Sequence, residues 1–167
     1  MKQEIIDRLP PDVKKEFMKY AIKLDQKKTE NKVKSDFLSF VKHVWPEFIE
    51  GDHHKKIAEK FNRLAEGKSK RIIINMPPRH TKSEFSSFLL PAWMVGRKPN
   101  LKIIQTTHTT ELAIRFGRKA KTLIDSPEYQ QVFKTRLRED SQAAGKWETE
   151  QGGEYYAAGV GSAITGR

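Results

Sequence analysis

The chain has 167 residues, no cysteine, and 32 lysine and arginine residues against 21 acidic ones, which gives a formal net charge of +11. This length is typical of one domain with its own core, and the lack of cysteine excludes disulfides and cysteine-based zinc sites. No run approaches the roughly 20 apolar residues of a membrane-spanning helix, and the charged N-terminus lacks the apolar centre of a secretory signal, so we expect a protein without membrane contact.

The N-terminal residues are predicted to form a helix, because apolar side chains recur at helical spacing up to about residue 28. The polar run Lys27–Ser35 indicates a loop or hinge. We therefore expect a division into residues 1–34, a helical segment with a hinge, and residues 35–167, the main domain.

Two further helices and a strand are expected next. An amphipathic helix begins near Ser35 and stops at Pro46, and another runs from Asp52 to Glu66. The β-branched run Arg71–Asn75 is typical of a strand that is covered on both faces. A proline-rich turn follows, and a helical pattern resumes at Lys82.

A second strand is predicted at Leu101–Thr106, and a long helix at about Thr109–Asp125. Shorter strand-like runs follow, of which Tyr155–Ala158 is the clearest. Strand, helix and strand in this order predict a βαβ unit, and hence an α/β fold with a mainly parallel sheet.

The segment Arg71–Glu84, RIIINMPPRHTKSE, delivers a Lys-Ser pair onto the first turn of a helix. Free backbone amides and the helix dipole favour an anion there, so Lys82 would reach the phosphates of a nucleotide and Ser83 would bind Mg²⁺. Met76 and Thr81 stand where the two glycines of the usual phosphate-loop pattern would fall. The residues alone therefore leave two interpretations open, a phosphate loop or a structural turn.

The run MPPRHTKSE resembles the divergent Walker A motif of tailed-bacteriophage terminase large subunits, the ATPases that drive DNA into viral capsids. In this resemblance Arg79 takes the place of an internal arginine finger, and Thr81 departs from the usual glycine. The resemblance implies catalytic roles for Arg79 and Lys82, with Mg²⁺ held through the nucleotide by Ser83. It implies an ATP-phosphate site formed by Pro78, Arg79, His80, Thr81, Lys82 and Ser83.

The resemblance extends over roughly residues 35–167 and includes the segment WPEFIEGDHHKKIAEKF, which in the family helps to hold the adenine base. It implies a P-loop NTPase-type αβα sandwich preceded by N-terminal helices. His53 and His54 would then flank the adenine, although ordinary helix-start residues are an equal alternative. Adjacent histidines on a helix point in different directions, so a metal site is not expected.

A working ATPase of this type needs a pair of acids at the end of another apolar strand, and the sequence contains no such run. Similar terminases place that acidic Walker B strand shortly after the segment matching Ile164–Gly166, and carry a C-terminal nuclease domain beyond it. The resemblance therefore implies the first part of the ATPase domain of a truncated chain. We expect it to bind nucleotide and to hydrolyse ATP poorly or not at all.

The resemblance implies the ATP-binding part of a viral DNA-packaging motor, with ATP and Mg²⁺ as cofactors. It also implies double-stranded DNA, the portal protein and the small terminase subunit as partners. A homo-oligomeric ring in the host cytoplasm, transiently at the procapsid portal vertex, would follow for the full-length protein. Arg115, Arg118 and Lys119 are candidate DNA contacts, and a solvated helix face is their alternative. Two other functions remain open: a helicase-like translocase and a non-catalytic, basic DNA-binding fragment.

Overall fold

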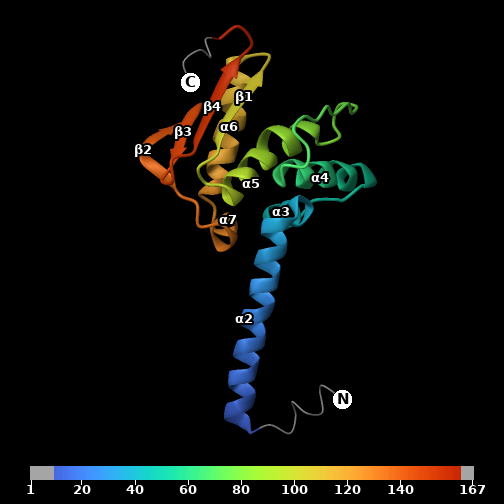
Figure 1. The fold of residues 1–167 in the computed structure, drawn as a ribbon, viewed down its shortest axis with the longest axis vertical. Helices are drawn as coiled ribbons and strands as arrows, with labels where there is room; N and C mark the ends of the chain where they lie inside the picture. The colour runs from blue at the N-terminus through green and yellow to red at the C-terminus, as the bar shows by residue number, and fades with distance from the viewer. Residues whose placement is uncertain (1–9, 163–167) are drawn as a thin grey trace.

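In the computed structural model, which describes residues 10–162, N-terminal helices precede a four-stranded mixed sheet (Figure 1). The helices are α2 (Pro11–Ser35), α3 (Phe37–Val44), α4 (Asp52–Ala65), the π-helix η1 (Glu84–Leu89), α5 (Leu90–Arg97), α6 (Thr110–Ile124) and α7 (Pro127–Val132). The strands are β1 (Lys102–Thr107), β2 (Leu137–Ala143), β3 (Lys146–Thr149) and β4 (Glu154–Gly159). Among the described residues, none of the helices is both long and apolar enough to cross a membrane.

Helix α2 continues without a break through Lys27–Ser35, so the predicted loop or hinge there is wrong. That polar run contains no glycine or proline, and its lysine and glutamate side chains lose little freedom in a helix. Figure 1 shows α2 projecting from the rest of the molecule. Only its last turns pack against the core, where the indole of Trp93 donates a hydrogen bond of 3.1 Å to the carbonyl of Val33.

A polar junction joins α3 to α4. The Asp36 carboxylate caps α3 by accepting the backbone N–H of Ser39 at 2.7 Å, and it also accepts the side-chain amide of Asn62 at 2.8 Å. The carbonyl oxygen of the Asn62 side chain accepts the N–H of Phe37 at 2.8 Å. These bonds satisfy donors at the start of α3 and fix it to α4.

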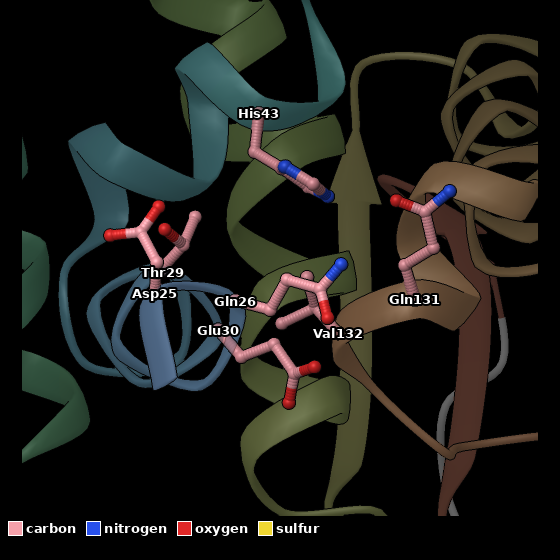
Figure 2. Close-up of a pocket in the computed structure, with 7 residues that line it drawn as sticks. All are labelled: Asp25, Gln26, Thr29, Glu30, His43, Gln131 and Val132. Carbon is pink, nitrogen blue, oxygen red and sulfur yellow. The ribbon is translucent and has the colours of Figure 1, made fainter. Parts of the chain in front are cut away.

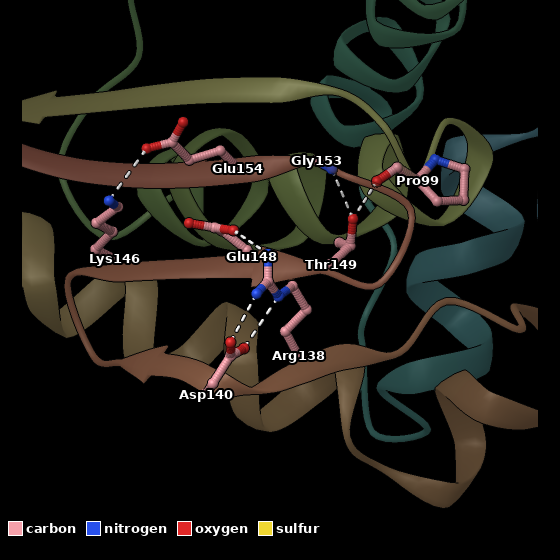
Figure 3. A network of polar contacts seen from close by, with 8 residues as sticks. All are labelled: Pro99, Arg138, Asp140, Lys146, Glu148, Thr149, Gly153 and Glu154. Atoms are coloured by element: carbon pink, nitrogen blue, oxygen red, sulfur yellow. Dashed lines mark hydrogen bonds and ion pairs between the residues drawn. The ribbon is translucent and has the colours of Figure 1, made fainter.

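The sheet has the order β1-β4-β3-β2, and only β1 and β4 run parallel. The predicted mainly parallel sheet is therefore wrong. Short turns decide the outcome, because strands joined by a few residues pair as antiparallel hairpins. Gly152 supplies the positive φ, 82°, for the turn between β3 and β4. Polar contacts around Thr149, Arg138 and Lys146 accompany these hairpins (Figure 3).

The predicted strand Arg71–Asn75 is extended but belongs to no sheet within residues 10–162. Its exposure alternates, with Ile72 and Ile74 packed against the core and Ile73 88% exposed. The predicted βαβ unit is therefore wrong, since β1 takes β4 as its parallel neighbour instead. The alternation is that of a strand with one face covered, and β-branched residues favour it even without a ladder.

The strand and helix predicted at Leu101–Thr106 and Thr109–Asp125 are confirmed as β1 and α6. Helix α6 packs against β1 and β4 (Figure 1). Its Gly117 allows the close approach, because a Cβ there would lie 2.7 Å from the ring of Tyr155. The indole of Trp147 stacks on that ring at 4.7 Å between centroids and donates to the Gly117 carbonyl.

We predict that Asp36→Ala lowers the free energy of unfolding by about 1–2 kcal/mol, because it removes the cap of α3 and a partner of Asn62. Partial burial raises the pKa of Asp36, but hydrogen bonds from Ser39 and Asn62 and the charge of Lys32 outweigh it, so the pKa lies below its ordinary value. Stability from such a group is present above its unfolded pKa, about 3.9, and is lost as pH falls through the folded value.

Urea unfolding at neutral pH and at about pH 3 checks this expectation, with Asp12→Ala on the exposed first turn of α2 as the matched control. The difference between Asp36→Ala and the unsubstituted protein should shrink at the lower pH. A difference that stays the same would show that the carboxylate charge is not what stabilises the junction.

Candidate functional site

The loop Pro77–Thr81 lies between the extended segment and a helix that opens at Lys82 (Figure 1, green, between α4 and α5). The helix continues through η1 into α5, and its first helical hydrogen bond runs from the N–H of Phe85 to the carbonyl of Thr81 at 2.9 Å. Amides ahead of that bond have no acceptor within the helix, and the helix dipole makes this end positive. The loop borders a hollow of about 560 Å³ lined by Met76, Pro77, Pro78, Arg79, Thr81, Lys82, Ser83 and Glu84.

Two loop residues adopt left-handed backbone conformations, Arg79 with φ 64° and Thr81 with φ 58°. This region is unusual for any side chain other than glycine and costs more for a β-branched one. Strain of this kind amounts to about 1–3 kcal/mol per residue and persists only where the surroundings impose it. Thr81, which stands where the usual pattern has glycine, thus takes a backbone conformation that glycine would adopt without strain.

The structure brings Lys82 and Ser83 together on the first helical turn, as expected from the sequence. The Lys82 ammonium donates to the carbonyl of Met76 at 3.4 Å, across the base of the loop. Ser83 is exposed on the same turn. The wider π-helical turn that follows ends two residues before Pro91, which lacks the N–H needed for a regular α-helical bond.

His54 on α4 is buried, with 5% of its surface exposed, and both of its ring nitrogens have partners. The backbone N–H of Gly51 donates to Nδ1 at 2.9 Å, so the proton of the neutral ring lies on Nε2. Nε2 donates to the hydroxyl oxygen of Thr81 at 2.7 Å. Burial lowers the pKa of His54, the charges of His53 and His80 lower it further, and Glu50 opposes them.

Two more histidines, His53 and His80, lie beside the His54–Thr81 pair. The ring of His53 is 3.8 Å from that of His54 and 5.7 Å from that of His80, centroid to centroid. His80 is exposed, and its Nδ1 donates to the carbonyl of Pro78 at 2.8 Å. The adenine-side role of His53 and His54 stays a prediction; with both nitrogens of His54 engaged, His53 is the better placed of the two.

Lys119, a candidate DNA contact, forms an ion pair with Glu84, with Nζ at 2.8 and 3.0 Å from the two carboxylate oxygens. This contact joins α6 to the residue that follows Ser83. Arg115 and Arg118 are exposed on α6 and line one shallow hollow. The three side chains thus come from one helix, but one of them is already paired.

A separate hollow of about 370 Å³ lies among α2, α3 and α7 (Figure 2). The carboxylates of Asp25 and Glu30 point in different directions there, and Glu30 pairs with Lys34 within α2 at 3.8 Å. Nothing in this hollow gathers ligands for a cation, and no cluster of metal-ligating side chains occurs in residues 10–162.

The carboxyl ends of the parallel strands β1 and β4 meet, where ligands of such sheets commonly bind. Among the described residues, hydroxyls gather there: Thr110 Oγ1 lies 3.1 Å from Ser162 Oγ and accepts the N–H of Gly159. A carboxylate pair is missing from these two strand ends within the described part of the chain. The helix start at Lys82, by contrast, favours an anion.

Comparison of the chain with models of protein families, with curated proteins and with solved structures finds no significant match. Sequence reasoning missed the His54–Thr81 and Glu84–Lys119 contacts, each of which joins residues far apart in the chain. The sequence does contain a signal for the His54–Thr81 contact, because a threonine at a glycine position needs a partner from outside the loop.

Proposed function

We propose that this chain is the ATP-binding part of a DNA-packaging motor of the terminase large subunit type, built as the first part of a P-loop NTPase domain. The observation that carries the proposal is the placement of Lys82 and Ser83 on the first turn of a helix, behind a loop with two left-handed residues. The motif MPPRHTKSE supports the terminase class over other P-loop enzymes, and the net charge of +11 supports a nucleic-acid partner.

The chemistry follows from the named groups. The amides at the start of the helix and the Lys82 ammonium bind the triphosphate, and the Ser83 hydroxyl binds Mg²⁺ held by the nucleotide. Arg79 lies in the loop, where its guanidinium would stabilise charge that develops on the γ-phosphate. Hydrolysis needs carboxylates that the described strand ends lack, so the proposal for these residues is binding, with turnover slow or absent.

Coupling to DNA is proposed through α6. Lys119 joins this helix to Glu84 at the phosphate site, and Arg115 and Arg118 extend from the same helix into solvent. A shift of the first helical turn on nucleotide binding would therefore act on the basic surface of α6 through one ion pair. Double-stranded DNA is the proposed ligand of that surface, with the portal, small subunit and ring assembly proposed for the whole motor.

We predict that Lys82→Ala weakens Mg²⁺–ATP binding at least tenfold, because a hydrogen bond to a charged group contributes about 1.5–3 kcal/mol. Isothermal titration calorimetry on the full chain measures this, with Lys134→Ala as a control that removes the same charge from the linker between α7 and β2. Equal binding by all three proteins would show that the loop is a structural turn.

The basic surface of α6 gives a second prediction. Replacing both Arg115 and Arg118 with alanine should weaken binding to duplex DNA and reduce the salt slope of log K by roughly two, since each phosphate contact contributes about 0.9. Fluorescence anisotropy over a salt series measures it, with and without Mg²⁺–ATP, and Arg63→Ala/Arg136→Ala is the matched control. An unchanged slope would show that the two arginines contact solvent and not DNA. DNA binding that is the same with and without Mg²⁺–ATP would favour a non-catalytic DNA-binding fragment.

A further inference from the structure

Thr81 has a strained backbone conformation in the candidate phosphate loop. Its φ of 58° is the conformation that glycine adopts freely and a β-branched residue avoids. A threonine in an isolated loop would relax from it, because its branched Cβ disfavours this region. A contact from elsewhere in the molecule must therefore hold Thr81 in place.

A chain of hydrogen bonds supplies that contact. The N–H of Gly51 donates to Nδ1 of His54, Nε2 of His54 donates to the Thr81 hydroxyl, and that hydroxyl donates to the carbonyl of His80 at 2.7 Å. Every donor has one acceptor, and the direction of the chain is fixed at both ends by backbone groups. Only the neutral imidazole with its proton on Nε2 fits both of its neighbours.

Aromatic side chains pack around the His54 ring, the middle member of this chain. The ring of His54 lies 4.8 Å from that of Phe48 and 5.0 Å from that of Phe85, centroid to centroid. Phe85 belongs to the helix that carries Lys82, so one packed cluster fixes both the imidazole and the start of that helix. The loop between them is thereby fastened to α4, an element outside the loop and its helix.

We infer that His54 is a positioning residue of the nucleotide site: through Thr81 it holds the phosphate loop in its binding shape, and so compensates for the threonine at the usual glycine position. This rests on the proposed function. Without the contact, the loop populates the binding shape only part of the time, and the apparent affinity falls by that fraction. Loss of one such hydrogen bond in a buried setting corresponds to a fall of about tenfold.

The charged neighbours of His54 set the expected pH response. Glu50 precedes α4 and pairs with Lys42 and Lys55, while His53 and His80 approach from α4 and from the loop. A protonated imidazole would direct a second N–H at the N–H of Gly51, so protonation opposes the chain of hydrogen bonds. Burial keeps the pKa of His54 below its ordinary value, and affinity should therefore fall only as pH drops below about 6.5.

The test measures Mg²⁺–ATP affinity of the full chain for a matched set of variants at about pH 7.5 and about pH 5. His54→Leu keeps the packing and removes both hydrogen bonds, whereas His54→Gln keeps a donor near Nε2 and cannot titrate. Thr81→Val keeps the branched shape without the hydroxyl. We expect His54→Leu and Thr81→Val each to weaken binding about tenfold, the double variant to be no weaker than either, and His54→Gln to recover most of the affinity.

The pH comparison separates positioning from mere structural support. The unsubstituted protein should lose affinity relative to His54→Gln at the lower pH, and this ratio cancels protonation of ATP itself. Additive effects of His54→Leu and Thr81→Val, or a ratio that stays constant while the His54 imidazole becomes protonated, would overturn the inference. So would unaltered affinity in His54→Leu.

A failure of the proposed function looks different. In that case the unsubstituted protein and Lys82→Ala bind ATP equally poorly. Thermal unfolding of His54→Leu, Thr81→Val and the double variant then tests the contact between His54 and Thr81 without nucleotide, because residues in direct contact give non-additive effects on stability. Additive effects on unfolding would show that His54 and Thr81 do not interact, and would overturn the inference whatever ligand the loop binds.

Discussion

The geometry of the site depends on the contacts that the ring of Phe37 makes with three other aromatic side chains. The ring meets Phe61 of α4 at 5.1 Å, Phe85 of η1 at 5.4 Å and Trp93 of α5 at 5.4 Å, all at steep interplanar angles. Such edge-to-face pairs contribute about 0.5–1.5 kcal/mol each beyond the area they bury. One fully buried side chain therefore fixes α4 relative to the helix that opens at Lys82. The segment that connects these two helices must span the distance that this packing sets.

The loop conformation follows from that constraint. Because its two ends are fixed by packing, the residues Pro77–Thr81 must turn sharply, and the two left-handed residues are where they do so. Proline fixes φ at Pro77 and Pro78, which leaves the later residues to absorb the turn. The imidazole of His54 then meets Thr81 at the tightest point. Core packing and loop strain are thus two aspects of one arrangement, in which the aromatic cluster sets the path and the hydrogen bond stabilises it.

The sequence predicted those parts of the fold that local patterns control. Amphipathic spacing located α4 and α6, and the strand-like runs Leu101–Thr106 and Tyr155–Ala158 located β1 and β4. Two predictions for single segments were wrong. The polar end of α2 was predicted to be a loop, although it contains no residue that breaks a helix. Arg71–Asn75 was predicted to be a strand of the sheet, although it pairs with no other strand in the described residues. Hairpin turns made the sheet mixed, which a pattern of strands and helices cannot reveal.

For the candidate site, the sequence located Lys82 and Ser83 at a helix start, because that depends on local order alone. It could not place His54, which meets Thr81 across 27 positions in the chain, or pair Lys119 with Glu84 across 35. Whether the site binds ATP stays a prediction, as do its partners. The physical reason is general: spacing fixes which residues share an element, whereas contacts between elements depend on packing that no short segment encodes.

The contact of Lys82 with Met76 has a different character from that of Thr81 with His54. At 3.4 Å from the carbonyl it is long for a hydrogen bond, and its acceptor is neutral. A phosphate oxygen offers the ammonium a charged acceptor at shorter range, and charge-assisted bonds are roughly twice as strong as neutral ones. The lysine therefore gains by exchanging the carbonyl for a ligand, while the loop keeps its shape through Thr81. If the site binds nucleotide as proposed, a loop held by one contact and a cation free to leave another would bind phosphate with little rearrangement, which is the condition for tight binding at a preorganised site.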